Sequence, residues 1–101
     1  MPAFGLSDNT LTLIRGILAE HPDVKTAILY GSRATGTYRK GSDIDLTLSG
    51  ANLDQRQLAE IAGKLDESVI PYQVDLSIRE QIDNPALLEH IQRVGVLFYE
   101  R

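Results

Sequence analysis

The sequence predicts an α/β chain of the α+β type: a mixed, partly antiparallel sheet flanked by helices. Segments whose apolar residues recur at helical spacing alternate with short strand-like runs. The first two strand-like runs are separated by a loop of about ten residues, fewer than the ~12 that a crossover between parallel strands requires. We therefore expect those two strands to be antiparallel. A doubly wound dinucleotide-binding fold is disfavoured, because no G-x-G-x-x-G follows a strand.

The first half of the chain contains a helix, a strand and a polar loop. The helix is expected to begin at Ser7 and to end before Pro22. Its apolar residues share one face: Leu11, Ile14, Ile17 and Leu18. Residues 26–30 form a short apolar run, typical of a strand that is buried on both faces. Residues 31–41 are rich in Gly, Ser, Thr and basic residues, which indicates a loop, with one helical turn after Ser32.

The middle of the chain continues the alternation of strands and helices. Residues 43–48 alternate strictly between polar and apolar, which predicts a strand. A helix is expected over 53–68, where Asp54 and Gln57 match a capping box. After Pro71, residues 72–78 alternate again and predict a third strand.

The last elements are a helix and a short strand. Asn84 followed by Pro85 is typical of a helix start, and Gly95 can close that helix. Residues 96–99 could form a final strand. With 101 residues the chain has room for one hydrophobic core, so we expect a single domain spanning 1–101.

Composition excludes several classes of function. With no Cys, the chain has no disulfide, thiolate nucleophile or Cys-based zinc site, and His21 and His90 do not form a spaced ligand cluster. No apolar run approaches the ~20 residues of a membrane span, and the start lacks the pattern of a signal peptide, so we expect a cytoplasmic protein without membrane contact. The net charge of -4 makes direct binding of nucleic acid improbable.

Three aspartates are the strongest candidates for chemistry. Asp43 and Asp45 lie two residues apart on an expected strand, so both should point to one face, and Asp75 should share its face with Gln73 and Ser77. If the two strands are neighbours, the three carboxylates meet on one patch. Asp is a poor strand former, so an ordinary polar sheet face explains the set less well than a Mg²⁺ site, in which two ions about 3.5–4 Å apart share carboxylates.

A glycine-serine pair precedes these aspartates. Gly31 and Ser32 follow the first strand, where glycine lets backbone approach a ligand and free N–H groups can bind an anion. Arg33, Arg39 and Lys40 place cations in the same loop, which favours phosphate binding beside a metal over a merely solvated loop.

The segment GSRATGTYRKGSDIDL, residues 31–46, resembles the signature of the nucleotidyltransferase superfamily related to DNA polymerase beta. That signature is Gly-Ser, about ten residues, Asp-x-Asp and a later acidic residue. Here ten residues separate Ser32 from Asp43, and Asp75 fits the later position. The spelling is similar to that of the minimal nucleotidyltransferases, which consist of the palm-like catalytic core alone.

The resemblance implies roles for these residues. Asp43, Asp45 and Asp75 would be the catalytic residues and the ligands of two Mg²⁺ ions, with Asp75 also helping to deprotonate the acceptor. Gly31 and Ser32 would hold the phosphates of ATP or another nucleoside triphosphate. Within the same motif, Arg33 and Ser42 are further candidates for nucleotide binding.

The resemblance also implies a partner. Minimal members pair with an all-helical HEPN protein, act as its antitoxin and transfer AMP to one of its tyrosines. Two alternatives stay open: transfer to a small hydroxylated molecule, with a homodimer or partner completing the pocket, and a non-catalytic protein that only binds a partner. Candidate contact residues for a partner are apolar: Phe4, Leu6, Tyr72 and residues 96–99.

Overall fold

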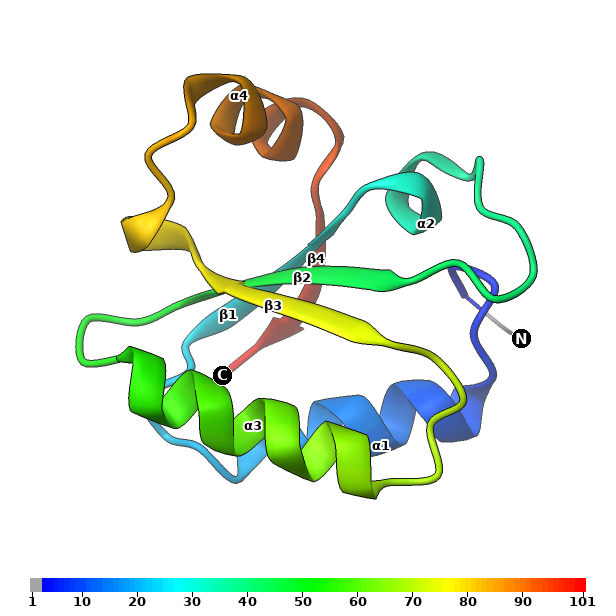
Figure 1. Cartoon of the computed structure of the whole chain (residues 1–101), viewed down its shortest axis with the longest axis horizontal. Helices are drawn as coiled ribbons and strands as arrows, with labels where there is room; N and C mark the ends of the chain where they lie inside the picture. The colour runs from blue at the N-terminus through cyan, green and yellow to red at the C-terminus, as the bar shows by residue number, and fades with distance from the viewer. Residues whose placement is uncertain (1–2) are drawn as a thin grey trace.

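A four-stranded sheet with strand order β3-β2-β1-β4 forms the centre of the computed structural model, which describes residues 3–101 (Figure 1). The strands are β1 (Thr26–Tyr30), β2 (Ile44–Ser49), β3 (Val74–Ile78) and β4 (Val96–Glu100). Strand β1 pairs antiparallel with β2 and with β4, whereas β2 and β3 are parallel. The sheet is therefore mixed and partly antiparallel, as the sequence predicted.

The three longer helices begin after the capping residues that the sequence predicted. They are α1 (Asp8–Ala19), α2 (Ser32–Thr35), α3 (Gln55–Glu67) and α4 (Pro85–Val94), with a short 3-10 helix η1 (Arg79–Gln81) after β3. The Ser7 hydroxyl caps α1 and the Asn84 side chain caps α4. At α3, Asp54 and Gln57 form the complete capping box, since each side chain accepts a hydrogen bond from the backbone N–H of the other.

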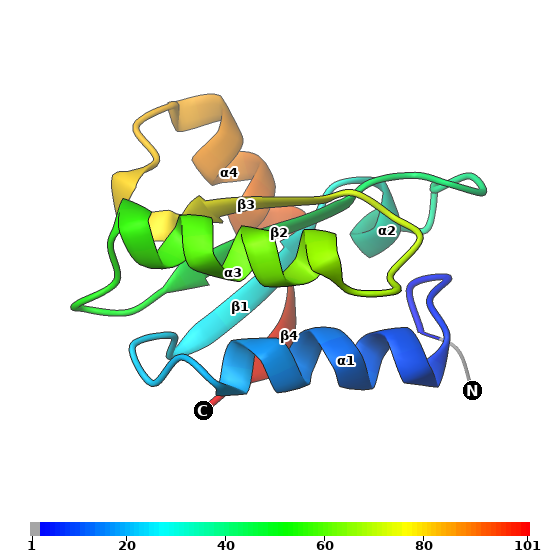
Figure 2. The same ribbon diagram turned by 60° about the horizontal axis from the view of Figure 1, so that its bottom comes forward.

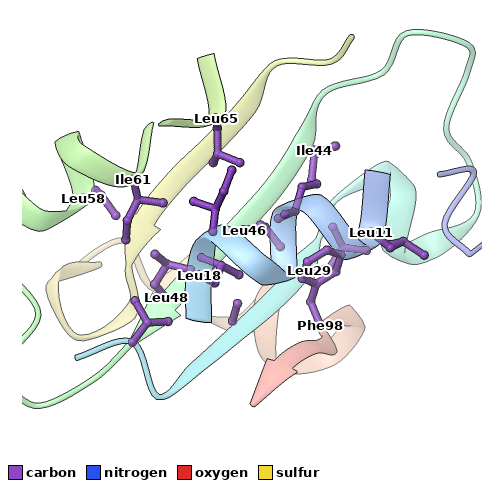
Figure 3. Packing of buried hydrophobic residues seen from close by; sticks show 14 of the residues in the cluster. Leu11, Leu18, Leu29, Ile44, Leu46, Leu48, Leu58, Ile61, Leu65 and Phe98 are labelled. Atoms are coloured by element: carbon purple, nitrogen blue, oxygen red, sulfur yellow. The ribbon is translucent and has the colours of Figure 1, made fainter. Parts of the chain in front are cut away.

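Two helices cover one face of the sheet and define the core. Helices α1 and α3 lie side by side on this face, and α4 lies on the opposite side (Figures 1 and 2). Between α1, α3 and the sheet lie large buried side chains, which come from both helices and from the sheet (Figure 3). They include Leu11, Leu18, Leu29, Ile44, Leu46, Leu48, Ile61 and Leu65. Because side chains alternate along a strand, this packing directs the intervening polar residues of β1, β2 and β3 to the other face.

Two strands begin later than the sequence predicted. Strand β2 begins at Ile44, so Asp43 lies one residue before the strand rather than in it. The reason is a turn at residues 39–42, in which Gly41 has a φ of 85° and Ser42 donates its N–H to the carbonyl of Arg39. Strand β3 begins at Val74, two residues later than predicted, because the first ladder bond runs from Ile44 N–H to the carbonyl of Gln73.

Most of the apolar residues expected to contact a partner belong instead to the core. Leu6 is fully buried and Phe98 nearly so, which removes both from the candidate contact residues. Phe4 packs its ring on that of Phe98, with 6.2 Å between centroids. Leu97 differs: half of its side chain is exposed. Over residues 3–101, no helix is long and apolar enough to cross a membrane.

Candidate functional site

Two aspartates face each other directly across the parallel pair β2–β3. Asp45 and Asp75 are register partners, and Tyr30 of β1 is the register partner of Asp45 on its other side. The three side chains therefore share the face opposite α1 and α3. Asp75 is exposed and Asp45 is half-buried. Thr47 and Ser77, the next pair on this face, are joined by a hydrogen bond of 2.9 Å from the Ser77 hydroxyl.

The carboxylates of this face act on one another electrostatically. Burial raises the pKa of the Asp45 carboxyl above its usual value, and the negative charges of Asp75 and then Asp43 raise it further. A weaker opposing effect comes from His90 on α4. Ionised Asp45 is thus destabilised by its surroundings, and a cation at this place would relieve that repulsion.

Gly31 brings the glycine-serine turn into contact with Asp45. The residue has a φ of 76° and caps α2, and a Cβ built on it would overlap Oδ2 of Asp45. Only glycine allows both this backbone conformation and this approach. Ser32, which follows, is the first residue of α2. The structure therefore brings together Gly31, Asp45 and Asp75, with Ser32 next to Gly31 at the start of α2.

Asp43 lies at the border of this group. It is exposed and follows the turn at residues 39–42, yet it is close enough for its charge to raise the pKa of Asp45. Arg39 and Lys40 are exposed in the same loop. The sequence interpretation that Asp43 and Asp45 point from one strand is wrong, since Asp43 precedes β2 and is placed by the loop.

Arg33 and Ser42 make internal contacts instead of facing the carboxylates. The Arg33 side chain is buried, and its guanidinium donates hydrogen bonds to the carbonyl oxygens of Ser42 and Phe4. The Ser42 hydroxyl accepts a hydrogen bond of 2.8 Å from the N–H of Arg39. This geometry favours a role in shaping the loop over the expected contact with nucleotide.

Two residues of the site were missed by sequence reasoning. Burial raises the pKa of the Tyr30 hydroxyl, the Ser77 hydroxyl opposes this, and the charges of Asp45 and Asp75 raise it further. His90 places its ring edge-on to that of Tyr30, with 6.2 Å between centroids. Tyr30 directly precedes Gly31 in the sequence, and this adjacency could have indicated that Tyr30 lies at the site. Nothing in the sequence near His90 indicated that α4 would bring it here.

The donor chemistry of Asp45 and Asp75 fits a divalent cation, although the site is not a closed metal cage. Among residues 3–101, no group of three or more His, Asp or Glu side chains is arranged closely enough to hold a metal ion. The facing pair nevertheless supplies hard oxygen ligands and negative charges that repel one another, which suit Mg²⁺. Such an ion commonly takes its remaining ligands from water and substrate phosphates.

Residues 13–101 match the family described as Polymerase beta, Nucleotidyltransferase. The chain belongs to this family. As a nucleotidyltransferase it has the fold expected from the resemblance, and the family uses divalent metals in general. No match to the sequence was found among curated proteins.

Several solved structures similar to this nucleotidyltransferase come from toxin–antitoxin complexes. One is a toxin–antitoxin crystal structure with AMP-PNP, at 26% identity and a TM-score of 0.73, with 95% of this chain and 75% of that chain covered. A second contains the tri-AMPylated HEPN toxin of Shewanella oneidensis with its MNT antitoxin, at 22% identity and a TM-score of 0.68, covering 92% and 71%. A third is the MntA–HepT complex, at 22% identity and a TM-score of 0.69, covering 94% and 74%. The last two likenesses, at this identity, establish the fold alone.

Proposed function

We propose that this nucleotidyltransferase transfers AMP from ATP to a tyrosine hydroxyl of a helical HEPN-type partner and thereby acts as its antitoxin. One observation carries the proposal: Gly31, directly before Ser32, packs against Asp45, which faces Asp75 across the β2–β3 pair. A phosphate-binding turn and a carboxylate pair in contact are what transfer of a nucleoside monophosphate needs. In this proposal the turn binds the triphosphate, and a carboxylate accepts the proton of the acceptor hydroxyl.

The residues divide the reaction between them. The Gly31–Ser32 turn holds the β- and γ-phosphates, since glycine permits close backbone approach and the Ser32 hydroxyl can donate a hydrogen bond. The acceptor oxygen attacks the α-phosphorus, its proton passes to Asp75, and the bond to the β-phosphate breaks so that pyrophosphate leaves with the electron pair. Asp75 suits the role of base because it is exposed on the open face.

Asp45 and Asp75, with Asp43 beside them, would hold Mg²⁺ in the complex with nucleotide. A Mg²⁺ ion held there would supply positive charge to offset the negative charge of the triphosphate and of the leaving pyrophosphate. The repulsion that raises the pKa of Asp45 fits this role, because it makes the face a better site for a cation than for a protein side chain.

The similar complexes support the choice of nucleotide and partner. One similar toxin–antitoxin structure contains AMP-PNP, an ATP analogue, and another contains an AMPylated HEPN toxin with an MNT antitoxin. This protein covers 75% and 71% of the two matched chains, so the core is shared with them, while the acceptor is inferred.

The test is incubation of the purified chain with α-³²P-labelled ATP, CTP, GTP or UTP and Mg²⁺, with and without an extract of the cells that produce it. We expect ATP to label a protein on tyrosine, with the mass increase of one AMP. Asp43→Asn and Asp45→Asn should abolish labelling, whereas Asp66→Asn on the opposite side of the sheet should not.

Each other outcome selects a different function. Label that appears only in a small molecule would make the chain a small-molecule transferase. AMP-PNP binding without labelling of any acceptor would favour the non-catalytic binding protein. Equal labelling by wild type and Asp45→Asn would remove the carboxylate pair from the mechanism.

A further inference from the structure

Arg33 is the most buried charged side chain near the site, and all of its contacts are internal. It is 3% exposed. Its Nε and Nη2 donate hydrogen bonds of 3.0 and 2.8 Å to the carbonyl oxygen of Ser42, and its Nη1 donates one of 2.9 Å to the carbonyl of Phe4. The guanidinium thus connects α2 to the loop before β2 and to the turn at residues 3–6, which lies beside that loop (Figure 1).

Two aromatic rings complete the surroundings of this guanidinium. Its central carbon lies 4.6 Å from the ring centroid of Tyr72 and 5.2 Å from that of Tyr38. Both distances are within the range of cation–π attraction. A planar guanidinium can donate in its plane and stack on rings at the same time, which the ammonium of lysine cannot do.

The turn at residues 3–6 has an unusual backbone conformation, which its contacts with Arg33 and Tyr38 stabilise. Ala3 and Leu6 exchange backbone hydrogen bonds of 3.1 and 2.8 Å, and between them Phe4 and Gly5 have φ values of 59° and 74°. Positive φ is unusual for a bulky residue and persists where the surroundings stabilise it. Here the Phe4 carbonyl is bonded to Arg33, and Gly5 packs against the Tyr38 ring, where a Cβ would overlap it.

The carbonyl that Arg33 holds belongs to the residue directly before Asp43. Ser42 is also held by Arg39, whose carbonyl accepts from the Ser42 N–H and whose own N–H donates to the Ser42 hydroxyl. Asp43 itself lies outside β2 and has no strand ladder to orient it. Its placement beside Asp45 therefore depends on Ser42 on one side and, on the other, on Ile44, whose N–H donates to the carbonyl of Gln73.

We propose that Arg33 is a positioning residue, which holds Asp43 at the catalytic face through Ser42, and that the N-terminal turn at residues 3–6 is part of the same device. The site role of Asp43 rests on the proposed function, but the hold on the loop does not. Direct binding of phosphate by Arg33 is the competing role. Lysine could take over phosphate binding, because it keeps the positive charge, but it could not make the hydrogen bonds and ring contacts of the positioning role.

The first measurement is hydrogen exchange of the loop amides, which needs no turnover. In Arg33→Lys and Arg33→Gln we expect residues 37–43 to exchange at least about tenfold faster, while α3 keeps its protection. Arg56→Gln, which changes an exposed arginine of α3, should leave the loop unchanged. Unchanged exchange in both Arg33 variants would overturn the proposal, whether or not the wild type transfers AMP.

The second measurement separates binding from turnover in AMP transfer from ATP. A positioning role predicts that kcat falls about tenfold or more in both Arg33 variants, with KM for ATP within about threefold of wild type. A phosphate-binding role predicts a large rise in KM for Arg33→Gln and recovery in Arg33→Lys, which keeps the charge. The latter pattern would overturn the proposal.

A surface variant covers the case in which the Arg33 variants fail to fold. Tyr38 is partly exposed, so its replacement leaves the core intact. Tyr38→Ala removes one of the stacked rings and should accelerate loop exchange and lower kcat severalfold, and Tyr38→Phe, which keeps the ring, should restore both. Equal behaviour of Tyr38→Ala and wild type would count against the proposal.

Discussion

The Asp45 carboxylate lowers the stability of the folded chain at neutral pH, although the proposed reaction needs its charge. The pKa of Asp45 is raised in the folded chain, mainly by burial and then by Asp75 and Asp43. The ionised form therefore destabilises the fold. This cost is absent well below the ordinary carboxyl pKa of about 4, where the group is protonated in both states, and it grows as pH rises through the folded-state value.

Asp45→Asn should accordingly raise Tm at pH 7 in the absence of divalent cations. The difference from wild type should shrink as pH falls toward about 4. Scanning calorimetry in EDTA measures this, with Asp66→Asn on the exposed surface of α3 as the control. A Tm increase that is the same at both pH values would show that charge is not the cause.

Gly31 permits a second prediction at the residue scale. Gly31→Ala should abolish AMP transfer, because the Cβ overlaps Oδ2 of Asp45 and φ is 76°. Gly16→Ala is the matched control: Gly16 lies in α1 with open space around it, and the change should stabilise the chain by about 0.5–1 kcal/mol. Transfer assays and urea unfolding of the two variants test both statements. Normal activity of Gly31→Ala would mean that the close approach of turn and carboxylate is unnecessary.

At the scale of elements, α3 stabilises the sheet without contributing to the site. Its N-terminus is closed by the capping box of Asp54 and Gln57, and its apolar residues pack on the face opposite Asp45 and Asp75. Asp54→Ala should lower the free energy of unfolding by about 0.5–2 kcal/mol and leave KM for ATP unchanged. Urea denaturation measures the first effect, with Asp66→Ala at the other end of α3 as control. A loss of activity larger than the loss of folded protein would show that α3 is coupled to the site.

At the scale of the whole molecule, the acceptor is expected to come from another chain. Leu97 of β4 pairs with Ile28, so it shares the sheet face of Tyr30 and Asp45, and half of its side chain is exposed. The chain alone should bind AMP-PNP and Mg²⁺ but transfer AMP slowly to small hydroxyl compounds. Leu97→Lys should reduce labelling of the protein acceptor without changing Tm, whereas Val69→Lys, at a more exposed site after α3, should not. Rapid transfer to a small compound by the monomeric chain would refute this prediction.

The amino-acid sequence by itself determined the elements and the motif. Helix starts at Ser7, Asp54 and Asn84 are local, because a capping side chain bonds to backbone three residues away or fewer. The antiparallel pairing of β1 and β2 followed from the length of the loop between them. The spacing of Gly31-Ser32 and Asp43 pointed to the family that the comparison with residues 13–101 establishes.

Only the tertiary structure decided which residues meet. The parallel pairing of β2 and β3 places Asp45 opposite Asp75, and the fold of α4 brings His90 to Tyr30. Arg33 looked like a phosphate ligand because its charge is visible in sequence while its burial is not. Burial and contact depend on elements distant along the chain, as with the Phe4 carbonyl that Arg33 binds. Local spacing therefore predicts the elements, whereas the packing between them determines which charges reach the open face.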